Sequence, residues 1–182
     1  MTESSNWRDK RDQILSQAKL IVIKVGSAVL TSPEGVDEQV VSRLADQISN
    51  LIDSGKQVIL VSSGAVPAGK NYLRSHNIEH TLPEKQAAAA IGQSRLMHIY
   101  DESFEQYNKI TAQVLLTRDD LRSRHRFLNA RNTFYTLLGN NVIPIVNEND
   151  TVVVQELEFG ENDFLASLIL NLVQADLFIN LT

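Results

Sequence analysis

The sequence predicts an α/β protein in which a mostly parallel sheet carries helices on both faces. Short apolar runs alternate along the chain with longer segments in which apolar residues recur at helical spacing, an order typical of βαβ units. The runs over 20–26 (LIVIKVG) and 57–63 (QVILVSS) are almost continuously apolar. Such runs favour strands that are buried on both faces, as in a parallel sheet.

Each element has its own sequence signal. The strand over 20–26 precedes a helix over 36–55, whose apolar residues share one face and which Gly55 ends. After the strand over 57–63, an alanine-rich helix is expected from Pro83 to Tyr107. The remaining predicted elements are strand 110–117, helix 118–141, strand 142–147, strand 151–159, helix 162–175 and strand 176–182.

Composition narrows the class of protein. A chain of 182 residues with 43% hydrophobic and 21% charged residues fits one globular domain. A net charge of −5 argues against nucleic acid and anionic membranes as partners. There is no cysteine, no signal-peptide pattern and no apolar run of the roughly 18 residues that a membrane span needs. We therefore expect a soluble, cytoplasmic protein with an N-terminal extension over 1–19 and one domain over 20–182.

Polar residues and glycines gather where the predicted strands stop. These stops are 24–27 (KVGS), 62–65 (SSGA), 147–150 (NEND) and the terminal Thr182. In parallel sheets ligands bind at the carboxyl ends of the strands, and a glycine there allows close backbone approach and leaves amide N–H groups for anions. The sequence therefore predicts a ligand site at this edge of the sheet.

Lys24 ends an apolar strand and has two interpretations. It either extends to solvent or pairs with a nearby carboxylate, or it directs a positive charge at a phosphate in a cleft. The Gly-Ser that follows favours the phosphate.

The segment from Gly64 to Lys70 resembles a phosphate-binding P-loop, but Asn71 occupies the position of the metal-ligating hydroxyl. We interpret the match as accidental. Ser63 and Gly64 remain candidates for gripping a small ligand, with a simple tight turn as the alternative.

Four carboxylates gather around two turns late in the chain. They are Glu148, Asp150, Glu161 and Asp163. The structural explanation is that Asn162 and Asp163 cap the following helix. The functional alternatives are amine binding, Mg²⁺ ligation or the orientation of lysines, and we favour a functional role.

Several motifs, in this order, resemble those of the glutamate 5-kinases of the amino acid kinase family. They are IKVGSAVLT, VSSGAVPAG, KQAAAAIGQSRL, AQVLLTRDD, RFLNARNT, PIVNENDTV and FGENDFLASLILNLVQADLFINLT, which lie within 20–182. The resemblance implies an amino acid kinase-like αβα sandwich. It also implies phosphorylation of the γ-carboxylate of L-glutamate to γ-glutamyl phosphate, the first step of proline biosynthesis. ATP and Mg²⁺ would be the cofactors, proline a candidate feedback inhibitor, and the enzyme a homo-oligomer.

The resemblance also implies roles for individual residues. Lys24 would contact the ATP phosphates and act in catalysis, and Asp163 would organise the catalytic lysines. Amides at Gly26 and Gly64 would stabilise the phosphoryl group during transfer. The implied glutamate-binding residues are Ser63, Gly64, Asp150 and Asn162, and the implied nucleotide-binding residues are Lys24, Gly26, Ser27 and Thr182. No residue is implied as a protein ligand to a metal.

Two features depart from the family pattern. Glu161 stands where the family usually has aspartate, and the sequence stops at Thr182, before most of the family's nucleotide-binding half and its C-terminal PUA domain. We therefore expect 20–182 to be the amino-acid-binding part of a truncated kinase domain. This chain alone is expected to be inactive, to bind no ATP and to self-associate. The alternatives are a non-catalytic glutamate-binding fragment and a related amino acid kinase.

Overall fold

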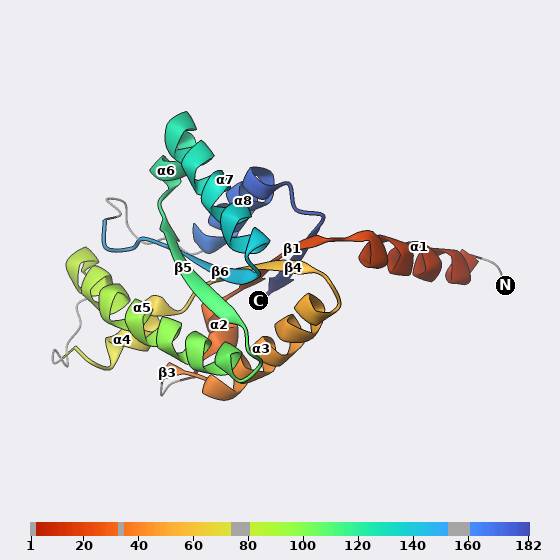
Figure 1. Ribbon diagram of the computed structural model, residues 1–182. Helices are drawn as coiled ribbons and strands as arrows, with labels where there is room; N and C mark the ends of the chain where they lie inside the picture. The colour runs from red at the N-terminus through yellow and green to blue at the C-terminus, as the bar shows by residue number, and fades with distance from the viewer. Residues whose placement is uncertain (1–2, 33–34, 74–80, 153–160) are drawn as a thin grey trace.

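A single parallel sheet forms the centre of the molecule (Figure 1). The computed structural model describes residues 3–32, 35–73, 81–152 and 161–182. The sheet has five strands in the order β5-β6-β4-β1-β7, and every strand pair in it is parallel. Its strands are β1 (Leu20–Val25), β4 (Gln57–Ser62), β5 (Ile110–Leu116), β6 (Val142–Glu148) and β7 (Leu177–Leu181). The predicted parallel α/β architecture is confirmed.

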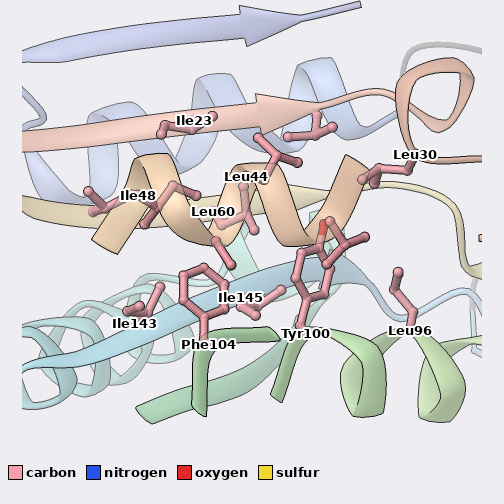
Figure 2. Close-up of a cluster of buried hydrophobic side chains, with 14 of the residues drawn as sticks. Ile23, Leu30, Leu44, Ile48, Leu60, Leu96, Tyr100, Phe104, Ile143 and Ile145 are labelled. Atoms are coloured by element: carbon pink, nitrogen blue, oxygen red, sulfur yellow. The ribbon is translucent and has the colours of Figure 1, made fainter. Parts of the chain in front are cut away.

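Helices cover both faces of this sheet because successive side chains of a strand point to opposite sides. Ile21 and Ile23 of β1 pack in one apolar cluster, and Leu20 and Val22 pack in another. The first cluster includes α3 (Glu38–Asp53) and α5 (Leu82–Glu105), and Figure 2 shows Tyr100 of α5 within it. The second includes α7 (Arg124–Gly139) and α8 (Glu161–Val173). The fold is therefore a three-layer αβα sandwich.

Two predicted elements differ from the structure. The helix expected over 118–141 is divided at Ser123, whose ψ of 117° is extended, into α6 (Arg118–Arg122) and α7. Asp120 forms a capping box with Thr117 at the start of α6, which makes this short helix a unit of its own. Residues 151 and 152 form a turn, and the rest of the strand expected over 151–159 lies outside the described residues.

Four short elements between the main strands were not predicted. They are α2 (Ser27–Leu30), the antiparallel pair β2 (Thr31–Ser32) and β3 (Gly35–Val36), and α4 (Ala65–Lys70). Helix α4 crosses α5 so closely that both helices need glycine at the contact. A Cβ added to Gly69 would lie 1.9 Å from Ala88 O, and one added to Gly92 would lie 1.8 Å from Ala65 O. Packing against α5 therefore supports a helix that its own sequence does not favour.

The predicted N-terminal extension contains α1 (Glu3–Gln17), which projects away from the sheet in Figure 1. Lys56 Nζ donates to the carbonyl oxygens of Ser16 and Ala18 at 2.7 and 2.5 Å, so its charge lies at the C-terminal end of α1. Within the described parts of the chain, no helix has both the length and the apolar character to cross a bilayer.

Candidate active site

The carboxyl ends of β1, β4, β6 and β7 share one edge of the sheet because these strands are parallel. Lys24 is in register with Val61 of β4 and with Asn180 of β7. Val61 is in register with Val146 of β6, which places the ends of β4 and β6 side by side. The predicted strand ends therefore lie together at one edge.

Lys24 forms an ion pair with Asp163 across this edge. Its Nζ lies 2.8 Å from Asp163 Oδ1, and the Lys24 side chain is only 6% exposed whereas that of Asp163 is 49% exposed. Asp163 lies in the first turn of α8, above the end of β1. A buried ammonium is thus held by a half-exposed carboxylate, an arrangement that can present both groups to a ligand.

Asn162 joins α8 to the end of β4. Its Nδ2 donates to Ser63 Oγ at 2.7 Å and more weakly to Ser62 O at 3.4 Å. Because α8 begins at Glu161, Asn162 is already inside the helix, and its side chain makes tertiary contacts. The structure therefore brings together the predicted residues Ser63 and Asn162, next to Lys24 and Asp163. The side chain of Glu161 is not among those described.

A buried chain of amides lies behind Asn162. Asn162 Nδ2 also donates to Asn147 Oδ1 at 3.2 Å, and Asn147 Nδ2 donates to Gln93 Oε1 at 2.8 Å. Asn147 and Gln93 are 3% and 9% exposed. The chain of hydrogen bonds links α5, the end of β6 and the start of α8.

Gly26 and Thr182 lie beside the lysine. A Cβ on Gly26 would lie 3.7 Å from Lys24 Nζ and 3.8 Å from Thr182 Cα. The N–H of Gly26 donates to Leu181 O at 2.8 Å, so this amide is used by the sheet. In α2, which begins at Ser27, the N–H groups of Val29 and Leu30 both donate to Gly26 O, at 3.1 and 3.3 Å. Lys24, Gly26, Ser27 and Thr182 thus form one side of the site.

The segment that resembles a P-loop has a different structure. Gly64 is in the left-handed region, with φ 103°, and precedes the six-residue α4. Gly69 is occupied in the contact with α5, and Lys70 is exposed at the end of α4. The interpretation of the motif as accidental agrees with this geometry, because neither Gly69 nor Lys70 lies at the strand end.

Asp150 lies slightly apart from the other predicted residues. It follows β6 and lines a cavity of about 360 Å³ together with Gln93 and Glu148, whereas Ser63 and Asn162 do not line this cavity. The described residues contain no cluster of three acidic or histidine side chains that could hold a metal ion. The site therefore has a lysine–aspartate part and a neighbouring cavity whose lining includes Gln93, Glu148 and Asp150.

A second buried hydrogen bond supports the end of β4. Ser62 Oγ lies 2.9 Å from Tyr100 Oη. Burial raises the pKa of the Tyr100 phenol far above its ordinary value, against a smaller lowering by the Ser62 bond. Tyr100 is therefore a neutral hydrogen-bonding group that fixes the strand next to Ser63.

The fold and this edge of the sheet agree with a family match. Residues 19–182 match the profile described as the amino acid kinase family. The chain belongs to the amino acid kinase family. Like the family match, a solved structure supports the fold: the carbamate kinase from Giardia lamblia bound to AMP-PNP superposes with a TM-score of 0.61 at 18% identity, covering 92% of this chain and 72% of that one.

Three sequence relatives of this amino acid kinase chain share a name. Glutamate 5-kinase from Oleidesulfovibrio alaskensis is 62% identical over 97% of this chain and 47% of its own length. Glutamate 5-kinase from Nitratidesulfovibrio vulgaris is 61% identical over 97% and 46%, and that from Geobacter sulfurreducens is 55% identical over 94% and 46%. The chain therefore spans about half the length of the curated relatives it matches.

Sequence reasoning did not find the residues of this family member that support the site from behind. Gln93, Asn147 and Tyr100 were not assigned a role. A signal was present for Gln93, which is a polar residue within an alanine-rich helix (AAAAIGQ). Its partner on β6 could not be identified without the fold.

Proposed function

We propose that the protein containing this chain is a glutamate 5-kinase, which transfers the γ-phosphoryl group of ATP to the γ-carboxylate of L-glutamate. The observation that carries this proposal is that two consecutive residues of α8, Asn162 and Asp163, bind Ser63 and Lys24 at one sheet edge. The 62% identity to a glutamate 5-kinase over nearly the whole chain supports the choice of substrate. The reaction would be the first step of proline biosynthesis.

The amino acid would lie over the ends of β4 and β6. Ser63 and Asn162 offer a hydroxyl and an amide at the first of these, and Asp150 offers a carboxylate at the second. A carboxylate suits the ammonium group of an amino acid, and a hydroxyl suits its carboxylate. The cavity of about 360 Å³ beside Asp150 is in the size range of small-molecule sites.

Phosphoryl transfer would take place beside Lys24. An oxygen of the γ-carboxylate would attack the γ-phosphorus of ATP, and the bond from that phosphorus to the bridging oxygen would break. ADP is then the leaving group, and γ-glutamyl phosphate is the other product. Positioning and charge stabilisation do most of the work in such transfers. Lys24 would balance negative charge on the phosphoryl oxygens, and Asp163 holds its ammonium in place.

The described residues fit a nucleotide phosphate better than a protein-bound metal. A buried ammonium and a glycine turn lie side by side, and the described residues contain no group of three acidic or histidine side chains placed to hold a metal ion. Mg²⁺ would accordingly be bound through the phosphates of ATP, as is common for this ion, and would neutralise part of their charge.

The test uses the complete encoded protein with L-glutamate and MgATP. We expect ADP release that depends on glutamate, and an acyl phosphate that hydroxylamine traps as a hydroxamate. Asp150→Ala should raise the KM for glutamate at least tenfold and leave that for ATP within twofold. ADP release with aspartate, N-acetylglutamate or carbamate instead of glutamate would identify a related kinase. Glutamate binding without ADP release would identify a binding protein, and either result refutes the proposal.

A further inference from the structure

One backbone N–H group determines the orientation of the buried side-chain amides of Asn147 and Gln93. The N–H of Glu148 donates to Asn147 Oδ1 at 2.9 Å, and a backbone N–H can only donate. The oxygen of the Asn147 amide must therefore face Glu148, and its nitrogen must face Gln93. Gln93 Oε1 accepts from that nitrogen at 2.8 Å. The backbone of β6 thus sets the orientation of two side-chain amides.

The orientation of the Asn147 amide also determines that of the Asn162 amide. Because Asn147 Oδ1 is an acceptor, the group of Asn162 that faces it at 3.2 Å must be the amide nitrogen. That nitrogen also donates to Ser63 Oγ at 2.7 Å. Asn162 Oδ1 must then point away from Asn147. Among the described residues it is buried and accepts no hydrogen bond.

The result is a site with one acceptor and one donor at defined positions. Asn162 Oδ1 can only accept a hydrogen bond, and Ser63 Oγ, which already accepts from Asn162, has its own hydrogen left to donate. A ligand that offers an N–H and a carboxylate oxygen would satisfy both groups. A buried acceptor without a partner is costly, and so a ligand that satisfies Asn162 Oδ1 binds more tightly.

We propose that Gln93 is a positioning residue for the amino acid substrate, which acts by holding Asn147, and through it Asn162, in the orientation that presents Asn162 Oδ1 to an N–H of the ligand. Only the identity of this ligand as L-glutamate rests on the proposed function. Gln93 itself is 9% exposed and also lines the cavity beside Asp150. It therefore lies between the two parts of the site that the amino acid would contact.

The test compares three variants of the complete encoded protein. Gln93→Met keeps the length of the side chain and removes the acceptor for Asn147 Nδ2. Gln93→Glu keeps that acceptor and serves as the conservative rescue. Gln47→Met makes the same chemical change on the exposed surface of α3 and is the control. KM and kcat are measured for glutamate and for ATP.

We expect Gln93→Met to raise the KM for glutamate about tenfold, equivalent to about 1.4 kcal/mol. The kcat and the KM for ATP should stay within threefold, because Lys24 and Asp163 are not part of the amide chain. Gln47→Met should keep wild-type constants within threefold, and Gln93→Glu, which adds a charge beside Glu148 and Asp150, should raise the KM for glutamate less than Gln93→Met does. An unchanged glutamate KM in Gln93→Met, or equal damage in Gln93→Glu, overturns the proposal.

A second measurement needs no substrate. ¹⁵N NMR, with Asn162→Asp for assignment, follows the side-chain amide protons of Asn162. In the wild-type protein they should exchange slowly with solvent, because this amide donates hydrogen bonds to Ser63 Oγ and Asn147 Oδ1. Gln93→Met should speed their exchange at least tenfold. Fast exchange in the wild type overturns the proposal even if Gln93→Met does not fold. Absence of glutamate phosphorylation by the wild type refutes the proposed function instead, and the exchange result still decides the role of Gln93.

Discussion

Removing Asp163 should destabilise the protein far more than removing Lys24, although the two residues form one ion pair. The reason is their unequal exposure. The Lys24 side chain is 6% exposed and that of Asp163 is 49% exposed. Asp163→Ala leaves a buried ammonium without its counter-charge. Lys24→Met leaves a carboxylate that water already reaches, and it replaces the buried charge with an apolar side chain of similar length.

The expected sizes follow from this asymmetry. Breaking a buried pair by removing one partner costs about 3–5 kcal/mol, and the half-exposure of Asp163 places Asp163→Ala at the lower end, about 3 kcal/mol. For a protein of 150–250 residues this lowers Tm by about 6–12 °C. Lys24→Met should stay within about 1 kcal/mol of the wild type, because removing a buried ion pair in favour of apolar groups is often neutral. The double variant should therefore be more stable than Asp163→Ala alone.

Urea unfolding of the wild type, Asp163→Ala, Lys24→Met and the double variant measures the coupling energy between the two residues. We expect this energy to be about 2–3 kcal/mol. Asp163→Asn is the control, since an amide oxygen still accepts from Lys24 and should retain part of the stability. Activity should separate from stability: Lys24→Met should be well folded while its kcat falls about 10²–10³-fold. Equal destabilisation by Lys24→Met and Asp163→Ala would show that attraction within the pair, rather than desolvation of the lysine, dominates.

Two further predictions concern the scaffold. Gly92→Ala should destabilise the protein by about 1–3 kcal/mol, because its Cβ would meet Ala65 O at 1.8 Å. Gly139→Ala, where no atom lies within 4 Å of the added Cβ, is the control, and equal melting temperatures would contradict the close crossing. The pKa of Asp176 is lowered by hydrogen bonds from the backbone N–H groups of Leu20 and its neighbour. Its contribution is therefore present above the ordinary carboxyl pKa of about 4 and is lost as pH falls through the lower folded value. Asp176→Asn should lower the free energy of unfolding at pH 7, measured by urea titration. The further decrease of this free energy below pH 4 should be smaller than in the wild type, and an unchanged pH profile would contradict this.

The sequence predicted those parts of the fold whose signal is local. Each strand of the sheet is an apolar run, and the long helices carry apolar residues at helical spacing, so the succession of elements along the chain and the parallel sheet were predicted. The order of the strands within the sheet was not predicted. Helix α4 was missed because Pro67 and Gly69 make its segment resemble a loop, and its support comes from α5. The division at Ser123 was missed because the segment reads as one helix when the capping box at Thr117 is not considered.

The candidate site, like the fold, could be predicted from the sequence only in part. Lys24 and Ser63 were predicted at strand ends, which a parallel sheet places together, and Asn162 was predicted in a turn before a helix. All three lie at one edge. Whether Lys24 reached solvent or a carboxylate could not be decided from an isolated strand, because Asp163 lies far away in the sequence. The roles of these residues in binding and catalysis stay predictions. The amides that orient Asn162 were beyond sequence reasoning, since hydrogen-bond direction depends on which groups face each other.

Helix α5 supports the amino acid side of the site without contributing a residue that the sequence assigned to it. Gly92 allows α4 to approach behind Gly64, Gln93 holds Asn147, and Tyr100 holds Ser62. Gln93 and Tyr100 are seven residues apart and lie on the same side of the helix, whereas Gly92 lies on an adjacent side. All three contacts still depend on how this one helix is placed. Lys24 depends on other elements, β1, β7 and α8. A small rotation of α5 would therefore disturb the hydroxyl and amide that we assign to the amino acid, and would leave the lysine that we assign to the phosphate in place.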